Sequence, residues 1–195
     1  MSKVTVIIQA RSNSTRLKNK IFKKIGNYTL IEWVIRRVKK SNADQIILAT
    51  SKNRNDKNLK EICNREKINF YSGDENNVLK RFINAAKFYN VKTIIRVCAD
   101  NPFIDSDEIN LLIKKFSFTE KKSDYYFNHR NYLNNSYADG FGAELFTSEL
   151  LNKIYKKELL DSHREHVTSY IWDNSKLFNL VPCGTNIKKE NHFLV

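Results

Sequence analysis

The chain has 195 residues, a length that suits one domain. Its hydrophobic share of 41% excludes an intrinsically disordered protein, and five glycines with two prolines exclude collagen-like and low-complexity sequences. Three widely spaced cysteines favour a reduced, cytoplasmic protein over a disulfide framework or a zinc site. No apolar run approaches the length of a membrane span, and we expect no signal segment before the first strand.

The formal net charge is +13, from 34 Lys and Arg against 21 Asp and Glu. Two explanations stand side by side: an anionic partner, either nucleic acid or a phosphorylated small molecule, and a lysine-rich solvated surface. The lysines are scattered, whereas a nucleic-acid binder more often concentrates them on one stripe with interleaved aromatic residues. We therefore expect the few arginines near strand ends to indicate the function better than the total charge does.

Short apolar runs alternate with segments of helical periodicity through the first part of the chain. Buried strands are expected at Val4–Gln9, Gln45–Thr50, Ile68–Tyr71 and Thr93–Cys98. A helix is expected after each strand, where apolar residues recur at helical spacing within 30–38, 59–63, 78–89 and 109–116. This order predicts an α/β protein with a mostly parallel, doubly wound sheet, which binds ligands beyond the C-terminal ends of its strands.

The alternation weakens after Asp124. The sequence there predicts strands at Tyr125–Asn128, Phe141–Phe146 and Leu177–Val181, and helices at Thr147–Tyr155 and Asp161–Asp173. We expect these elements to pack on the same sheet, with some strands antiparallel, so that residues 1–195 form a single domain.

The most informative segment is Gln9–Lys20, which follows the first strand directly and reads QARSNSTRLKNK. Its small polar side chains leave backbone N–H groups free to face an anion. Arginine adds a bidentate fork for phosphate oxygens, and lysine adds a compact charge. The segment matches neither a Walker A loop nor GxGxxG, so its residues indicate a triphosphate site about as readily as an ordinary polar loop.

Two further segments follow strands that we expect to end at the same edge. Gly73 suits a tight turn, and Asp74 or Asn76 can cap the next helix. Asp100, in Arg96–Ile104, could bind a divalent cation together with a triphosphate, or it could simply cap a helix.

The last two segments carry carboxylate and imidazole groups. Glu144 could face a sugar site or solvent, and Asp139 could bind substrate or water around a metal. His163 and His166 are three residues apart, whereas the zinc protease motif needs four and a third ligand is missing. Two roles remain open for the polar residues of this helix: they support a substrate pocket, or they form a purely structural polar network.

Taken in order, these segments resemble the cytidylyltransferases, above all the spore coat polysaccharide biosynthesis protein F family, with the Kdo and acylneuraminate cytidylyltransferases as relatives. The matching patterns are QARxxSTRLxxK, G-x-x-x-D-V-L, R-x-x-x-D-x-P-x-I, D-G-x-x-x-E-x-F and R-E-H-V-T. This chain departs at Asn13, where members have Gly, and at Lys18-Asn19, where they have Pro-Gly. Because Asn tolerates positive φ, Asn13 and Asn19 can keep the turn.

The resemblance implies a three-layer α/β/α Rossmann-like fold of the nucleotide-diphospho-sugar transferase type and a triphosphate site with catalytic Arg11, Arg16 and Lys20. Lys20 would be the principal charge stabiliser, Asp100 would bind Mg²⁺, and Asn77 replaces the Asp that usually borders the base. The implied nucleotide-binding residues are Gln9, Ala10, Arg11, Ser12, Asn13, Arg16, Lys20, Gly73, Asn77 and Asp100.

The resemblance also implies transfer of CMP from CTP to an acidic sugar or phosphorylated acceptor, with release of pyrophosphate. The implied substrate-binding residues are Arg96, Asp139, Glu144, Arg164, Glu165 and His166. Family members continue past a strand like Phe193–Val195 into V-D-T-x-x-D, where related Kdo enzymes take a second metal carboxylate, so we expect a chain incomplete at its C-terminus.

The expected partners are therefore CTP and the acceptor, not nucleic acid or a membrane, and a homodimer is left open. One alternative is a non-catalytic nucleotide- or sugar-binding protein. Another is a basic RNA-binding module, although the concentration of charge at strand ends argues against it.

Overall fold

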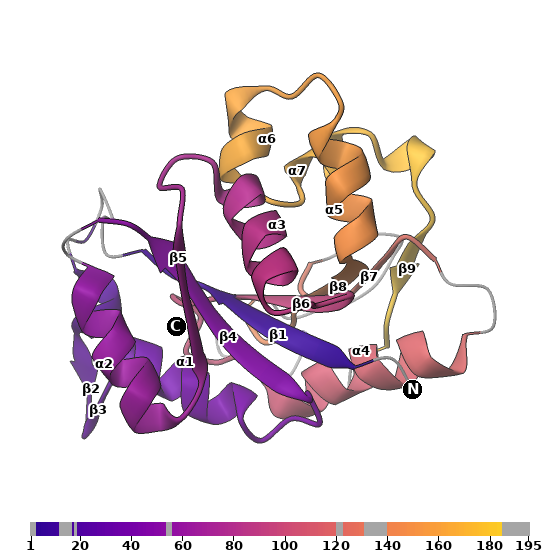
Figure 1. Ribbon diagram of the computed structural model, residues 1–195. Helices are drawn as coiled ribbons and strands as arrows, with labels where there is room; N and C mark the ends of the chain where they lie inside the picture. Colours follow the sequence, from indigo (N-terminus) through magenta and orange to yellow (C-terminus); the bar gives the residue numbers. More distant parts are fainter. Residues whose placement is uncertain are drawn as a thin grey trace.

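The computed structural model describes residues 3–11, 17, 19–53, 56–119, 123–130 and 140–184. A seven-stranded sheet in the order β5-β4-β1-β6-β8-β7-β9 forms its centre (Figure 1). β8 pairs antiparallel with β6 and β7, and the other pairings within this sheet are parallel, which confirms the predicted mostly parallel mixed sheet. The strands are β1 (Val4–Gln9), β4 (Gln45–Ser51), β5 (Asn69–Gly73), β6 (Thr93–Cys98), β7 (Tyr125–Phe127), β8 (Glu144–Thr147) and β9 (Leu180–Pro182).

Helices cover both faces of the sheet, as Figure 1 shows, and this confirms the three-layer α/β/α architecture. One face packs against α1 (Leu30–Val38), α2 (Lys57–Glu66) and α4 (Ser106–Phe118). The other packs against α3 (Val78–Phe88), α5 (Ser148–Tyr155) and α7 (Ser169–Asp173), and α6 (Asp161–Glu165) contacts α3 and α7 on the same side. Within the described residues, none of the helices has the length and apolar character needed to cross a membrane.

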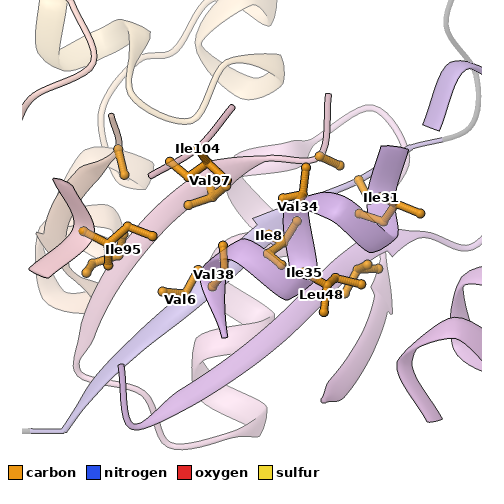
Figure 2. Packing of buried hydrophobic residues seen from close by; sticks show 14 of the residues in the cluster. Val6, Ile8, Ile31, Val34, Ile35, Val38, Leu48, Ile95, Val97 and Ile104 are labelled. Atoms are coloured by element: carbon orange, nitrogen blue, oxygen red, sulfur yellow. The ribbon is translucent and has the colours of Figure 1, made fainter. Parts of the chain in front are cut away.

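Both faces of the central strands are apolar because both are covered by helices. Ile8 and Leu48 pack against α1 through Val34 and Ile35, and all four side chains are fully buried (Figure 2). Ile7 points to the opposite face, into the core under α3 and α5. Burying side chains of this size contributes about 1.5–3 kcal/mol each, so these two cores account for much of the stability of the sheet.

A small hairpin, β2 (Lys24–Ile25) and β3 (Tyr28–Thr29), precedes α1 and was not predicted. Its turn contains Gly26 at φ 61°, a conformation that glycine adopts without steric cost. The Trp33 indole N–H donates to the Ile25 carbonyl at 2.8 Å, which fixes the hairpin to α1. Thr29 and Glu32 form a capping box that starts the helix.

Three predicted boundaries after Asp124 are wrong. The strand expected from Phe141 begins at Glu144, and Leu177 lies in a 3₁₀ turn, η3 (Ser175–Leu177), before β9. The helix expected over Asp161–Asp173 is broken between α6 and α7. His166 adopts extended backbone angles there, φ −107° and ψ 98°, and the next residue, Val167, is fully buried in the core.

Leu48→Ala should lower the free energy of unfolding by about 2–5 kcal/mol, because it leaves a cavity where strand and helix side chains meet. Urea denaturation followed by circular dichroism measures this change. Leu160→Ala is the matched control, since the Leu160 side chain is 66% exposed and its truncation should leave stability nearly unchanged. Equal losses in the two variants would contradict the assigned core.

Candidate active site

The polar segments singled out in the sequence meet at one edge of the sheet. We call this the functional edge: the C-terminal ends of β1, β4, β5 and β6, with the first residue of β8. β8 runs antiparallel to β6, and its first residue, Glu144, pairs in register with Arg96. The end of β6 is tied to the end of β1 by the Ala99 N–H, which donates to the Gln9 carbonyl at 2.9 Å.

Lys20 and Asp100 meet at this edge, although 80 residues separate them in the sequence. The Lys20 Nζ lies 2.7 Å from Asp100 Oδ2, and the two side chains are 30% and 48% exposed. Lys20 opens the short 3₁₀ helix η1 (Lys20–Phe22), preceded by Asn19 in the left-handed conformation at φ 55°. The expectation that Asn19 supplies this turn in place of glycine is confirmed.

Arg11 and Glu165 form a second ion pair across the site. Arg11 follows β1, and Glu165 ends α6, which lies on the sheet face opposite α1 (Figure 1). Arg11 Nη2 lies 3.0 Å from Glu165 Oε1, with the side chains 47% and 43% exposed. The predicted triphosphate loop and the predicted substrate helix are therefore neighbours.

Arg96 and Glu144 form a buried ion pair at the same edge. Arg96 Nη1 lies 2.5 Å from Glu144 Oε1, and Arg96 Nε donates to Gln9 Oε1 at 2.9 Å. His129 Nε2 approaches the same carboxylate oxygen at 3.4 Å. The solvent-facing alternative for Glu144 is wrong, because the residue is only 4% exposed and its charge is compensated by Arg96. A substrate contact by either residue stays a prediction.

The environment of this pair keeps both groups charged. Burial alone would raise the pKa of the Glu144 carboxyl, but the Arg96 guanidinium opposes it, and the pKa lies below its ordinary value. Burial alone would also lower the pKa of Arg96, and negative neighbours including Glu144 raise it instead. Arg96 is thus a compensated cation rather than a free anion site.

The loop after β5 is ordered by its own polar side chains. Asp74 Oδ1 accepts from the Asn77 N–H at 2.8 Å, and Asn77 Oδ1 accepts from the Lys80 N–H at 2.9 Å. The cap of α3 is therefore Asn77, not Asp74 or Asn76 as expected. Gly73 serves close packing rather than a turn, since a Cβ there would lie 2.9 Å from the ring of Tyr71.

Arg81 is a residue of this region that sequence reasoning missed. It lies on α3, is fully buried, and donates from Nη1 to the Asp74 carbonyl at 2.9 Å. Burial lowers its pKa to about 10, so the guanidinium is still charged at neutral pH. An arginine on the apolar face of a helix, beside Val78 and Phe82, was the signal available in the sequence.

His163, on α6, and His166, which follows the helix, lie in different environments. His163 Nδ1 accepts from the Leu160 N–H at 3.2 Å, so the proton is on Nε2, which donates to Asp173 Oδ2 at 2.9 Å. His166 is exposed where the helix ends. Arg164 makes a long, exposed contact with Asp161, at 3.9 Å.

In the part of the chain that the structure describes, no three His, Cys, Asp or Glu residues cluster as metal ligands would. Asp100 offers a single partly exposed carboxylate, which fits a hard cation held jointly with phosphate oxygens and water. Four predicted site residues, Ser12, Asn13, Arg16 and Asp139, lie outside the described residues.

Comparison with known proteins identifies related chains. The cytidylyltransferase family profile matches residues 5–194. An uncharacterized protein of Methanocaldococcus jannaschii, MJ1063, is 38% identical over 179 residues, 91% of this chain and 70% of that protein. The spore coat polysaccharide biosynthesis protein SpsF of Bacillus subtilis is 31% identical over 186 residues, 92% of this chain and 74% of SpsF.

Among solved structures, a cytidylyltransferase from Leptospira borgpetersenii matches with a TM-score of 0.88 at 28% identity, over 96% of this chain and 78% of that chain. A doubly wound sheet binds its ligands at the C-terminal edge of its strands, which is where the cations and carboxylates described above lie. The chain belongs to the cytidylyltransferase family, whose members are CTP-dependent transferases.

Glu144→Gln should lower the free energy of unfolding by about 3 kcal/mol, because it leaves Arg96 buried without a compensating charge. Chemical denaturation at pH 7 measures the loss. Glu149→Gln is the control: its exposed pair with Lys153 on α5 should contribute nothing measurable.

The effect of Glu144→Gln should also depend on pH. The pKa of Glu144 is lower in the folded protein than its ordinary value of 4.5, so the ion pair stabilises the fold above that pH. This contribution is lost as the pH falls below 4.5 and the carboxylate is protonated. The stability difference between wild type and variant should therefore shrink in acid, and a difference independent of pH would rule out an ion-pair origin.

Proposed function

We propose that this protein transfers CMP from CTP to an acidic sugar or a phosphorylated acceptor, with release of pyrophosphate, in the synthesis of a surface polysaccharide or glycoconjugate. The observation that carries the proposal is the meeting of Lys20 with Asp100 at the functional edge of a cytidylyltransferase fold. Similarity to SpsF, a spore coat polysaccharide biosynthesis protein, supports the biological context.

Lys20 and Arg11 bind the triphosphate of CTP. Both are partly exposed, both project from the segment after β1, and both lie beside carboxylates rather than in the core. Lys20 stabilises the negative charge that develops as the pyrophosphate leaves, and Arg11 fixes the orientation of the phosphate chain. The loop ordered by Asp74 and Asn77 borders the base.

Asp100 would hold the divalent cation, Mg²⁺ in this proposal, jointly with phosphate oxygens of the nucleotide. When bound, such an ion neutralises the charge of the phosphates and polarises the phosphorus that is attacked. The Asp100 carboxylate is exposed enough to take part, and a single protein carboxylate suffices for an ion that keeps several waters.

An oxygen of the acceptor attacks the α-phosphorus in line with the leaving pyrophosphate, and CMP becomes linked to the acceptor. A phosphate or carboxylate nucleophile is already ionised and needs no base, whereas a hydroxyl nucleophile must lose a proton to one. The acceptor binds beside the ends of β6 and β8 and α6, where Glu165 pairs with Arg11, and we propose Arg164 and His166 as its further contacts. We place the reaction in the cytoplasm, a reducing compartment, because the three cysteines are free thiols.

Calorimetric titration should show tighter binding of CTP than of ATP or GTP, because the base lies against the loop after β5. A pyrophosphate-release assay with each nucleoside triphosphate, Mg²⁺ and a panel of sugar acids and sugar phosphates then identifies the acceptor. Equal affinities for all the triphosphates would leave only a generic phosphate site and would contradict cytidylyl transfer.

Lys20→Ala should slow pyrophosphate release by roughly 10²–10³, the scale for losing one preorganised charge donor. The melting temperature should hardly change, because a partly exposed ion pair contributes little to stability. Lys24→Ala, in the exposed hairpin, is a control that removes the same charge away from Asp100. A large loss of stability with turnover intact would mean that Lys20 is structural.

A further inference from the structure

The two described cations of the triphosphate site are already paired with carboxylates. Lys20 lies 2.7 Å from Asp100, and Arg11 lies 3.0 Å from Glu165. In each pair the cation comes from the segment after β1 and the carboxylate from an element on the acceptor side, the end of β6 or the end of α6. We call these the placeholder pairs.

We propose that the triphosphate replaces both carboxylates of the placeholder pairs, and that the exchange makes Asp100 available to the divalent cation only once nucleotide is bound. The proposal rests on the function proposed above and adds an order of binding to it. The cation then enters with the nucleotide or after it, and Glu165 becomes free to face the acceptor.

The exposure of the pairs makes this exchange inexpensive. All four side chains are between 30% and 48% exposed, and ion pairs at that depth are weak and readily broken. The buried Arg96–Glu144 pair differs, because its side chains are only 12% and 6% exposed and breaking it would strand a charge in the core. The functional edge therefore combines two replaceable pairs with one permanent pair.

The ammonium group of Lys20 also hinders a cation directly. A divalent ion that approached Asp100 in the empty site would meet a positive charge 2.7 Å from the same oxygen. Repulsion and competition for the carboxylate act in the same direction. A triphosphate removes both obstacles at once, since it attracts Lys20 and supplies further oxygen ligands to the ion.

The first arm of the test uses Mn²⁺ alone, monitored by the loss of its free-ion electron paramagnetic resonance signal, with no nucleotide present. Lys20→Met should raise Mn²⁺ affinity by about five- to tenfold over wild type, because it removes the competing charge. Lys23→Met, an exposed lysine at the end of the same turn, is the matched control and should change little. Adding Asp100→Asn to Lys20→Met should abolish the gain.

The second arm measures CTP affinity by calorimetry in the presence of a chelator. Glu165→Gln should raise this metal-free affinity by about two- to fivefold, because Arg11 no longer has to leave a carboxylate. Asp161→Asn is the matched control: it removes the same charge from the first residue of the same helix, where Asp161 contacts Arg164 and not Arg11, and it should have no such effect. A structural role for Glu165 would produce no gain in affinity.

The outcomes separate the two proposals. Unchanged Mn²⁺ affinity in Lys20→Met and unchanged CTP affinity in Glu165→Gln, with CTP binding to wild type intact, would overturn the exchange and leave the function standing. A wild type that binds no CTP would overturn the proposed function and the exchange with it. Melting temperatures of all variants verify that each affinity is measured on folded protein.

Discussion

The buried contact between Arg96 and Glu144 is the constraint on which the functional edge depends. It crosses from β6, the last of the four parallel strands, to β8, the strand that reverses direction. The same guanidinium donates to Gln9, so the end of β1 is fixed by the same group. It adds a side-chain link to the backbone pairing of β1 with β6, so the segment that carries Arg11 and the turn that carries Asp100 begin from strand ends held in register.

The first two-thirds of the fold could be predicted from sequence because the sheet is covered on both faces. Central strands such as β1 and β4 then appear as continuous runs of branched apolar residues, and helices as periodic ones. The hairpin before α1 was missed, although its Gly26-Asn27 turn is a recognised hairpin signal, because its strands are only two residues long. The break between α6 and α7 was missed because helical periodicity persists across it, while the tertiary burial of Val167 requires extended backbone.

The candidate site could be predicted where charged residues lie in the segment that follows a strand. Asp100 was a candidate from its position and Lys20 from the loop chemistry, the family resemblance gave both their roles, and the structure brings the two side chains together. The sequence could not show which charged residues form ion pairs. Nothing in the local pattern indicates that Glu144 compensates the charge of Arg96, or that Arg11 contacts Glu165. Arg81 escaped notice for a related reason, since a charged residue at a buried helical position is explained only by the loop carbonyl that it contacts.

The position of β1 at the centre of the sheet also has a consequence for how the chain folds. Val4 pairs with Thr93, so the first strand must wait for a partner 89 residues further along. At ribosomal rates of about 5–20 residues per second, that wait is roughly 5–20 s. During this time Ile7 and Ile8 have only β4 beside them, and one edge of an apolar strand stays open. Non-local parallel pairing of this kind is slow, so this edge of β1 offers unpaired backbone groups to other chains until β6 has been made.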